Sequence, residues 1–296
     1  MPKGPHAAAP LQLSRKATVA ELASAALASA AAQMRSNTRG TRDDRGAEYG
    51  HQLRVGARRA RVVVRLFSRR IGKARAARLA RELRWAFRRI GVLRDYDMLL
   101  TQVIEPLTVD EVMPALELLA SEVMRRRKRA AQAVKRALGS ERYGTLLREL
   151  DRLERDLARA DDRRARKWIK KRLGNRLQAV LGMREAALGR DEVAQHALRK
   201  RLKKLRYATE LVPGLWRKKR VKRYLSHLKA LQDTLGAVTD TATARRLLHE
   251  VSESAQGDLR EALALCEGQL VAQRTERSAK LAPAFDVLEA TAPFWA

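Results

Sequence analysis

The feature that most constrains this chain is a near-repeat of its own sequence at a spacing of 145 residues. Residues 51–61, His-Gln-Leu-Arg-Val-Gly-Ala-Arg-Arg-Ala-Arg, return at residues 196–206 as His-Ala-Leu-Arg-Lys-Arg-Leu-Lys-Lys-Leu-Arg. An internal repeat predicts a fold assembled from two equivalent units. Because the repeated residues are mostly cations with one histidine, rather than apolar residues, the two copies predict a single site built from both units.

The register of the repeat continues without a gap for about thirty further residues, as expected of a duplication. Lys and Arg make up 63 of the 296 residues, so matches between basic residues also arise by chance. The matches of scarcer types, such as Gly91 with Gly236 and Asp95 with Asp240, carry more weight. We therefore predict a true duplication, with helical repeats at residues 15–145 and 160–290. Matched cations on a second helix are Lys73/Lys218, Arg75/Arg220, Arg78/Arg223 and Arg84/Lys229.

The composition predicts an all-α fold. The chain has only 8 Pro and 16 Gly and is rich in Ala, Leu, Arg and Glu, which are strong helix formers. Hydrophobic residues make up 45% of the chain, which is enough to build a core. Residues 1–14 are expected to form a flexible tail. No run of about 18 apolar residues is present, so no membrane span is predicted.

Helix boundaries follow from the apolar periodicity and the positions of Gly and Pro. Gly91 is a candidate C-cap, Asp95 and Asp240 are candidate N-caps, and residues 36–45 and 189–191 are predicted loops. Each repeat then holds at least four helices, enough for a four-helix bundle. Helices are expected at residues 16–35, 47–70, 73–90, 95–105, 110–138 and 143–160, and again at 163–181, 192–212, 218–235, 241–253 and 257–281.

The net charge of +30 predicts a polyanionic partner, because such an excess of like charge destabilises a compact protein by itself. Nucleic acid, an anionic membrane surface and another phosphate polymer all fit. Aromatic residues make up only 4% of the chain, few for a protein that stacks bases. The single cysteine, Cys266, excludes a disulfide framework within one chain.

On a helical wheel, the cations of the repeat fall on one face and the apolar residues on the other. His51 and its neighbouring arginines oppose residues such as Leu53 and Val63, and His196 lies on the matching stripe opposite Leu198. Few acids interrupt either stripe, and Glu210 is the first on the second one. Arginine suits phosphate because its planar guanidinium donates two hydrogen bonds at once. The predicted anion-binding residues on the stripes are His51, Arg54, Arg58, Arg61, Arg65, His196, Arg199, Lys203 and Arg206, with Arg84 and Lys229 added from the second helix.

Catalytic and metal sites are not predicted. Asp95 and Asp240 each follow a glycine by four residues, which favours N-capping over metal binding or acid–base chemistry. There is no phosphate-binding Gly-rich loop, no pair of cysteines and no nucleophile with an evident base. An enzyme acting on a phosphate polymer usually needs acidic residues that hold Mg²⁺ beside the cations, and the stripes lack them. We therefore expect neither enzyme activity nor a cofactor.

The two basic segments, with Gly-Val-Leu-Arg-Asp-Tyr-Asp at residues 91–97 and Leu-Gln-Asp-Thr-Leu-Gly at residues 231–236, resemble the CHAD family, the conserved histidine α-helical domain. The resemblance covers about residues 15–290. It implies two four-helix bundles related by a pseudo-twofold axis, with a basic cavity between them. It also implies non-catalytic binding of inorganic polyphosphate at granules in the cytoplasm. Arg59 and Lys204 match the family motif too, although both lie off the centre of their stripes.

A nucleic-acid-binding protein is the alternative, since charge alone does not separate it from a polyphosphate binder. The basic clusters at residues 125–129 and 218–223 offer contacts to DNA outside any cavity. The scarcity of aromatic residues argues against recognition of single strands.

Overall fold

The computed structural model describes residues 4–107, 113–159, 163–189, 192–252 and 259–296, and over these residues the chain is helical and contains no strand. The predicted all-α class is confirmed. The first half contains α1 (Val19–Arg42), α2 (Ala47–Leu66), α3 (Ser68–Ile71), α4 (Lys73–Leu99), the π-helix η1 (Leu100–Ile104), α5 (Met113–Leu138) and α6 (Glu141–Ala158). The second half contains α7 (Ala165–Leu181), α8 (Arg184–Leu188), α9 (Glu192–Glu210), the 3₁₀ turn η3 (Pro213–Leu215), α10 (Lys218–Ser252), α11 (Leu259–Ala279) and α12 (Leu281–Ala290).

The duplication seen in the sequence is also present in the helix boundaries. The helices α2 and α9 begin at Ala47 and Glu192, and α4 and α10 begin at Lys73 and Lys218. Both pairs are 145 residues apart, the spacing of the sequence repeat. The short turn α3 has its counterpart in η3. The predicted pseudo-twofold axis between the halves stays a prediction.

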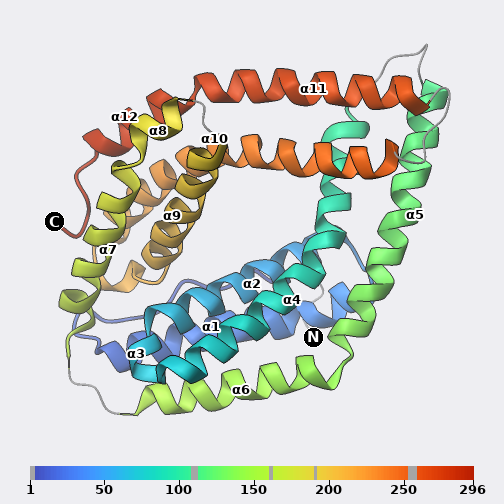
Figure 1. Cartoon of the computed structure of the whole chain (residues 1–296). Coiled ribbons are helices and arrows are strands. Elements are labelled where there is room, and N and C mark those ends of the chain that lie inside the picture. The colour runs from blue at the N-terminus through green and yellow to red at the C-terminus, as the bar shows by residue number, and fades with distance from the viewer. Residues whose placement is uncertain (1–3, 108–112, 160–162, 190–191, 253–258) are drawn as a thin grey trace.

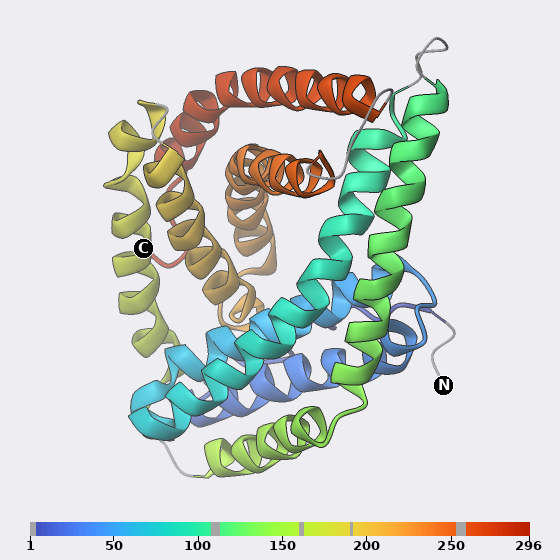
Figure 2. The same ribbon diagram turned by 45° about the vertical axis from the view of Figure 1, so that its right-hand side comes forward.

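The helices form a frame around a central space (Figures 1 and 2). In the first half α1 packs on α2 and α6, and α2 packs on α4; in the second half α10 packs on α9, α11 and α12, and α7 packs on α9. The halves meet in two places. On one side α1 and α2 contact α7 and α9, and on the other α5 and η1 contact α11. Residues from both halves therefore face the space between them.

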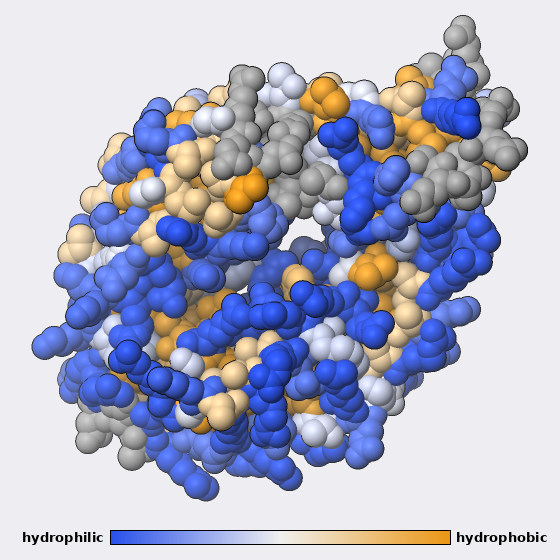
Figure 3. Space-filling view, viewed as in Figure 1, coloured by the Kyte–Doolittle hydropathy of each residue, from blue (hydrophilic) through white to orange (hydrophobic). Residues whose placement is uncertain are grey.

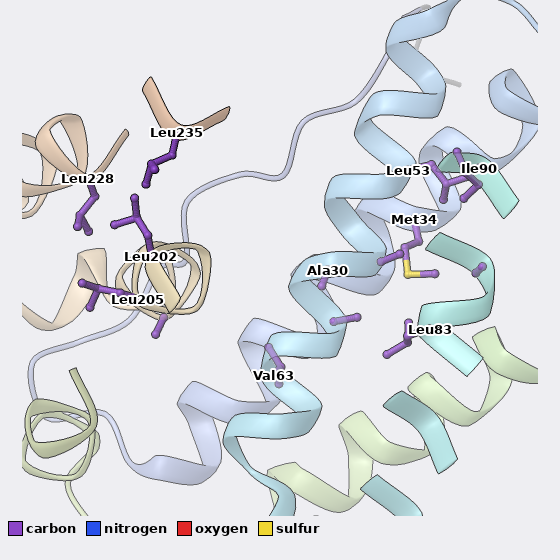
Figure 4. Close-up of a cluster of buried hydrophobic side chains, with 14 of the residues drawn as sticks. Ala30, Met34, Leu53, Val63, Leu83, Ile90, Leu202, Leu205, Leu228 and Leu235 are labelled. Carbon is purple, nitrogen blue, oxygen red and sulfur yellow. The ribbon is translucent and has the colours of Figure 1, made fainter. Parts of the chain in front are cut away.

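The apolar faces predicted from the helical wheel are buried. Leu53, Ala57, Ala60, Val63 and Val64 on α2 are fully buried. So are Leu198, Leu202 and Leu205 on α9. Figure 4 shows two groups of core side chains, one between α1, α2 and α4 and the other between α9 and α10. Each basic helix is thus fixed to its half by its apolar side, with the opposite face left for the space between the halves.

An aromatic pair joins the two halves at the end of α2. Phe67, which follows α2, stacks on Trp168 of α7 with ring centroids 4.8 Å apart and planes inclined by 8°. The guanidinium carbon of Arg172 lies over the Trp168 ring, 3.7 Å from its centroid. Phe67 also ends α2, so the predicted helix over residues 47–70 is divided into α2 and α3, and the predicted break at Gly72 is confirmed by its φ of 89°.

The prediction of helix ends at Gly91 and Gly236 is wrong. The helix α4 continues through Gly91 to Leu99, and α10 continues through Gly236 to Ser252. A Cβ atom on Gly91 would lie 2.8 Å from Nη1 of Arg54, so this glycine makes room for an arginine rather than capping a helix. Asp95 lies inside α4, not at an N-cap, with its carboxylate 3.7 Å from the Arg54 guanidinium. The side chain of Asp240 lies outside the described residues.

The predicted loop at residues 36–45 is also largely wrong, because α1 continues to Arg42. The polar residues there satisfy their hydrogen bonds within the helix. The Thr38 and Thr41 hydroxyls donate to the carbonyls of Met34 and Asn37, both at 2.8 Å, and Asn37 donates to the carbonyl of Gln33 at 2.7 Å. Polar composition alone therefore did not indicate a loop here.

The remaining boundaries agree with the prediction to within a few residues where the structure describes them. The predicted helix start at Asp110 and the loop end at Asp191 lie outside the described residues. In the predicted tail, residues 5–14 contain no helix, but Leu11 is buried and the backbone N–H of His6 donates to Asn37. No helix in the described part of the chain is long and apolar enough to cross a membrane.

A partly buried ion network fixes α5 to α4 and to the turn after α1. Arg127 of α5 donates to Asp97 of α4 at 2.7 Å and to both carboxylate oxygens of Asp44 at 2.7 and 2.8 Å. The hydrogen bonds to Asp44 raise the pKa of Arg127, and those to Asp97 raise it further. Asp97 is only 6% exposed, so its charge depends on this partner.

Replacing Arg127 by alanine is expected to lower the free energy of unfolding by about 3 kcal/mol, because Asp97 would keep a buried charge without its partner. Urea unfolding followed by circular dichroism measures this. Arg129→Ala, an exposed position on the same helix, is the control and should change stability by less than about 0.5 kcal/mol. Equal losses for the two variants would show that the network does not stabilise the fold.

Candidate functional site

A cavity of about 730 Å³ lies between the two halves, and we call it the central cavity. Its walls come from α2 and α4 of the first half and from α7 and α9 of the second. Seen from the side of Figure 1, the molecule is hollowed in the middle, with hydrophilic residues around the hollow (Figure 3). The lining residues are Arg58, Arg61, Val62, Arg65, Arg84, Phe87, Arg88, Arg176, Lys200, Lys203, Lys204 and Tyr207.

Nine of these twelve residues are cations and none is acidic. The concentration of positive charge affects the pKa values of individual side chains. Burial lowers the pKa of Arg61 to about 10, and repulsion from Arg65 and Arg84 adds to this effect. Burial likewise lowers the pKa of Lys204, with a further contribution from Arg65 of the other half. The cavity therefore holds cations that disfavour one another, an arrangement that a polyanion would relieve.

Phe87 supports three of the arginines. Arg54, Arg58 and Arg61 place their guanidinium carbons 4.3, 5.1 and 5.7 Å from the centroid of its ring. Attraction between a cation and the face of an aromatic ring fixes such side chains without a carboxylate. Of these three arginines, Arg58 and Arg61 line the central cavity, where the ring helps to hold their guanidiniums in place.

Arg58 also links the halves across the cavity. Its Nη1 donates to the hydroxyl of Tyr207 on α9. Tyr207 is only 2% exposed, and its ring lies under Arg206, 4.8 Å from the guanidinium carbon. The position of α9 relative to α2 is thus fixed at the wall of the cavity itself.

The structure brings six of the predicted residues together in the central cavity. They are Arg58, Arg61, Arg65, Arg84, Lys203 and Lys204. Lys204, which the sequence placed off the stripe centre, lines the cavity. Its counterpart Arg59 does not, because it is 8% exposed and donates to Gln33 of α1 at 3.2 Å. Arg59 therefore lies outside the cavity lining, and its contact with an anion stays a prediction.

The other predicted residues do not line the central cavity. Arg54 lies against Gly91 and forms the ion pair with Asp95. Arg206 forms an ion pair with Glu210 at 3.3 Å, one helical turn further along α9. Burial raises the pKa of that carboxyl, and Arg206 partly opposes the shift. Outside the lining lie His51, Arg54, Arg59, His196, Arg199, Arg206 and Lys229.

The two histidines lie beside cations that line the cavity. Burial lowers the pKa of His51; Glu48 partly opposes this, while Arg94 and Arg58 add to it. Burial also lowers the pKa of His196, and Lys200, Arg199 and Lys203 lower it further. Both imidazoles are therefore mainly neutral at pH 7 in the ligand-free protein.

Sequence reasoning missed Arg88, Arg176 and Lys200, because it assumed that the repeats use equivalent residues. On α2 the lining positions are 58, 61, 62 and 65, whereas on α9 they are 200, 203, 204 and 207. The α9 positions correspond to Val55, Arg58, Arg59 and Val62, so the two faces are offset by three residues, nearly one helical turn. Arg88 was detectable, since it lies four residues beyond Arg84 on the same helix face.

A basic groove of about 510 Å³ continues from the central cavity along α3 and the start of α4. Arg65 and Arg84 line both spaces, so the two are adjacent. Lys73 and Arg81 add cations further along. The positive surface is therefore elongated, which suits a polymer better than a compact anion.

Comparison with family models matches residues 25–249 to the CHAD domain, about three quarters of the chain. The chain belongs to the CHAD family. The CHAD domain of this chain supplies every residue that lines the central cavity.

Solved structures agree with this assignment. The crystal structure of the CHAD domain from the plant Ricinus communis is 28% identical, with a TM-score of 0.87 over 98% of both chains. PptA from Streptomyces chartreusis is 16% identical, with a TM-score of 0.65 over 91% of this chain and 100% of that one, which shows a shared fold alone. Comparison with the curated proteins finds no significant match.

The Arg61→Met variant of this CHAD domain is expected to be more stable than wild type without ligand, by about 1 kcal/mol at low salt. It removes a charge that the surrounding arginines disfavour while keeping the apolar stem. The gain should shrink at 0.5 M salt, because ions screen the repulsion. Thermal unfolding at both salt concentrations measures the effect. A loss of stability at low salt would contradict the proposed repulsion.

Proposed function

We propose that this protein binds inorganic polyphosphate in the central cavity without acting on it chemically. The observation that carries the proposal is the nine cations from both halves that face one cavity with no acidic residue among them. A chain of phosphates places negative charge at regular intervals along a flexible polymer. Such a ligand can follow the cavity and the adjoining groove, and it releases counterions as the cations neutralise it.

The side chains suit phosphate oxygens. Five arginines of the first half, and one arginine and three lysines of the second, offer many N–H donors, and the guanidinium fork binds two oxygens of one phosphate. Arg58 and Lys203 are matched residues of the repeat and lie in opposite walls of the cavity. A ligand between them would satisfy donors of both halves at once. We accordingly propose one shared site, and not one site in each half.

Single-stranded nucleic acid fits the cavity less well. Bases are held by stacking on exposed aromatic faces. Phe87 has a face covered by Arg54, and Tyr207 is 2% exposed. The cavity therefore offers charge for a phosphate backbone but no free platform for a base, which favours a polymer made of phosphate alone.

A catalytic role is not supported by the carboxylates near the cavity. Glu210 is paired with Arg206, and Asp95 is paired with Arg54. Phosphoryl transfer usually requires carboxylates that are free to hold Mg²⁺ against the phosphates. We propose a binding protein that associates with polyphosphate granules in the cytoplasm.

Removing one cation from either half is expected to weaken binding of long-chain polyphosphate by about tenfold at low salt. Arg61→Ala tests the first half and Lys203→Ala the second. Each variant should also reduce the slope of log affinity against log salt by about one, by analogy with nucleic acids. Isothermal titration at several salt concentrations measures both quantities.

The control is Arg129→Ala, an exposed cation on α5 that lines no part of the cavity. It should leave the affinity within about twofold, since a distant exposed charge adds little. Normal binding by either cavity variant would contradict a shared site. Displacement of polyphosphate by duplex DNA of equal phosphate charge would instead favour the nucleic-acid alternative.

Polyphosphate is expected to bind more tightly as the pH falls from about 7 to about 5.5, because nearby phosphates raise the pKa of His51 and His196 and these imidazoles take up protons on binding. Their pKa values are lowered in the free protein, so both imidazoles carry few protons at pH 7 before the ligand binds. The variant with His51→Gln and His196→Gln should bind with little dependence on pH. A pH profile like that of wild type would exclude the histidines from the site.

A further inference from the structure

A second basic pocket, of about 130 Å³, lies on the outside of the molecule and shares no residue with the central cavity. We call it the outer pocket. Its cations are Arg15 before α1, Arg166 in the first turn of α7, and Arg217 and Arg220 at the start of α10. Trp216 and Phe294 form its apolar walls.

The backbone around the outer pocket is held in place by several contacts. The N–H of Ala165 donates to the carbonyl of Ala17 at 2.9 Å, and the N–H of Val19 donates to the carbonyl of Arg163 at 2.9 Å. These bonds fix the segment before α1 against the start of α7. A Cβ atom on Gly214 would lie 2.2 Å from the carbonyl oxygen of Leu13, so this glycine allows the same segment to cross η3. Arg15 and Arg217 are therefore brought together by the fold.

The aromatic wall is equally fixed. Trp216 packs edge-to-face on Phe294 with centroids 5.4 Å apart, and Phe294 packs on Tyr224 and Trp295 at 5.7 and 4.7 Å. Figure 1 shows the C-terminal end of the chain beside α7. Arg166 lies over the Trp216 ring, 5.4 Å from its centroid. The ring orients this guanidinium without neutralising it.

Charge in the outer pocket is not balanced by side chains. Within the described part of the chain, none of the four arginines forms an ion pair with an Asp or Glu side chain, whereas Arg75 and Arg78 of the first half pair with Asp156 and Glu149. Ala296 also lines the pocket, and a carboxylate there would offset one of the four charges. At least three positive charges are left for an external anion.

The size of the outer pocket indicates what it can hold. A water molecule occupies about 30 Å³ in the liquid, so the pocket has room for about four waters. One or two phosphate groups fit this space. The four arginines line it from three segments of the chain: before α1, in the first turn of α7 and at the start of α10.

We propose that the outer pocket is a second phosphate site, which takes the end or a short stretch of an inorganic phosphate chain. This inference rests on the proposed function, because it assigns the same ligand class to a separate place. A protein with one site in the cavity and one outside holds two phosphate chains at once. It would therefore crosslink polyphosphate instead of only coating it.

The test is a titration with tripolyphosphate at low salt, measured by isothermal titration calorimetry. Wild type is expected to bind tripolyphosphate in the central cavity and one further equivalent in the outer pocket. Arg166→Ala with Arg220→Ala should bind one equivalent fewer than wild type, with the affinity of the cavity unchanged. Arg61→Ala with Lys203→Ala should keep the one equivalent held by the outer pocket. Lys128→Ala with Arg129→Ala removes two exposed charges from α5, lines neither pocket, and should bind like wild type.

The results separate the two proposals. The wild-type number of equivalents bound by the outer-pocket variant, with wild-type affinities, would overturn the second site. Loss of the outer equivalent alone, with cavity binding retained, supports it. Absence of cavity binding in both wild type and the outer-pocket variant would refute the proposed function while leaving the outer equivalent measurable. An outer-pocket variant that loses only affinity for duplex DNA would identify a nucleic-acid contact and contradict the phosphate-chain proposal.

Discussion

Repulsion between like charges in the central cavity destabilises the fold, and the rest of the structure has to offset it. Two unit charges 4 Å apart near a protein surface repel by about 4 kcal/mol, and nine cations face this one space. Three features hold them there. The apolar sides of α2 and α9 are fully buried, Phe67 and Trp168 join the halves, and the ring of Phe87 holds the guanidiniums of Arg58 and Arg61. These contacts therefore stabilise the fold enough to keep a cationic surface in place for an anion.

The fold class and the main helices were predictable from the sequence. The apolar stripes of α2 and α9 are strongly periodic, so burial of Leu53 and Leu202 followed directly from the wheel. The repeat spacing also predicted the matched starts of α4 and α10. These features depend on local periodicity and on comparison of the chain with itself, both of which a single sequence contains.

The errors arose where tertiary packing determines the role of a residue. Gly91 resembles a helix end in sequence, yet it lies within α4 because Arg54 crosses it. Arg59 is a cation of the repeat, yet Gln33 of another helix binds it inside the first half. Arg176 reaches the cavity from α7, which carries no part of the basic repeat. Each of these depends on which helix lies opposite, and spacing along the chain does not specify that.

The offset between the lining faces of α2 and α9 also depends on tertiary packing. Duplication supplied two similar basic helices, and the way in which they pack then selected different turns of each for the cavity. Arg65 lines the cavity, whereas its counterpart Glu210 pairs with Arg206. The cations of the second half therefore repel one another less than those of the first half. The lining of the central cavity is consequently asymmetric, although α2 and α9 carry the sequence repeat.

A crystal structure of the protein with a bound phosphate chain tests the central claim most directly. We expect phosphates in the central cavity, bonded at the same time to arginines of α2 or α4 and to lysines of α9. Arg61 and Lys203 are the contacts to inspect first, one from each half. Phosphates that contact only one half, or an ordered chain elsewhere with the central cavity unoccupied, would contradict the shared site.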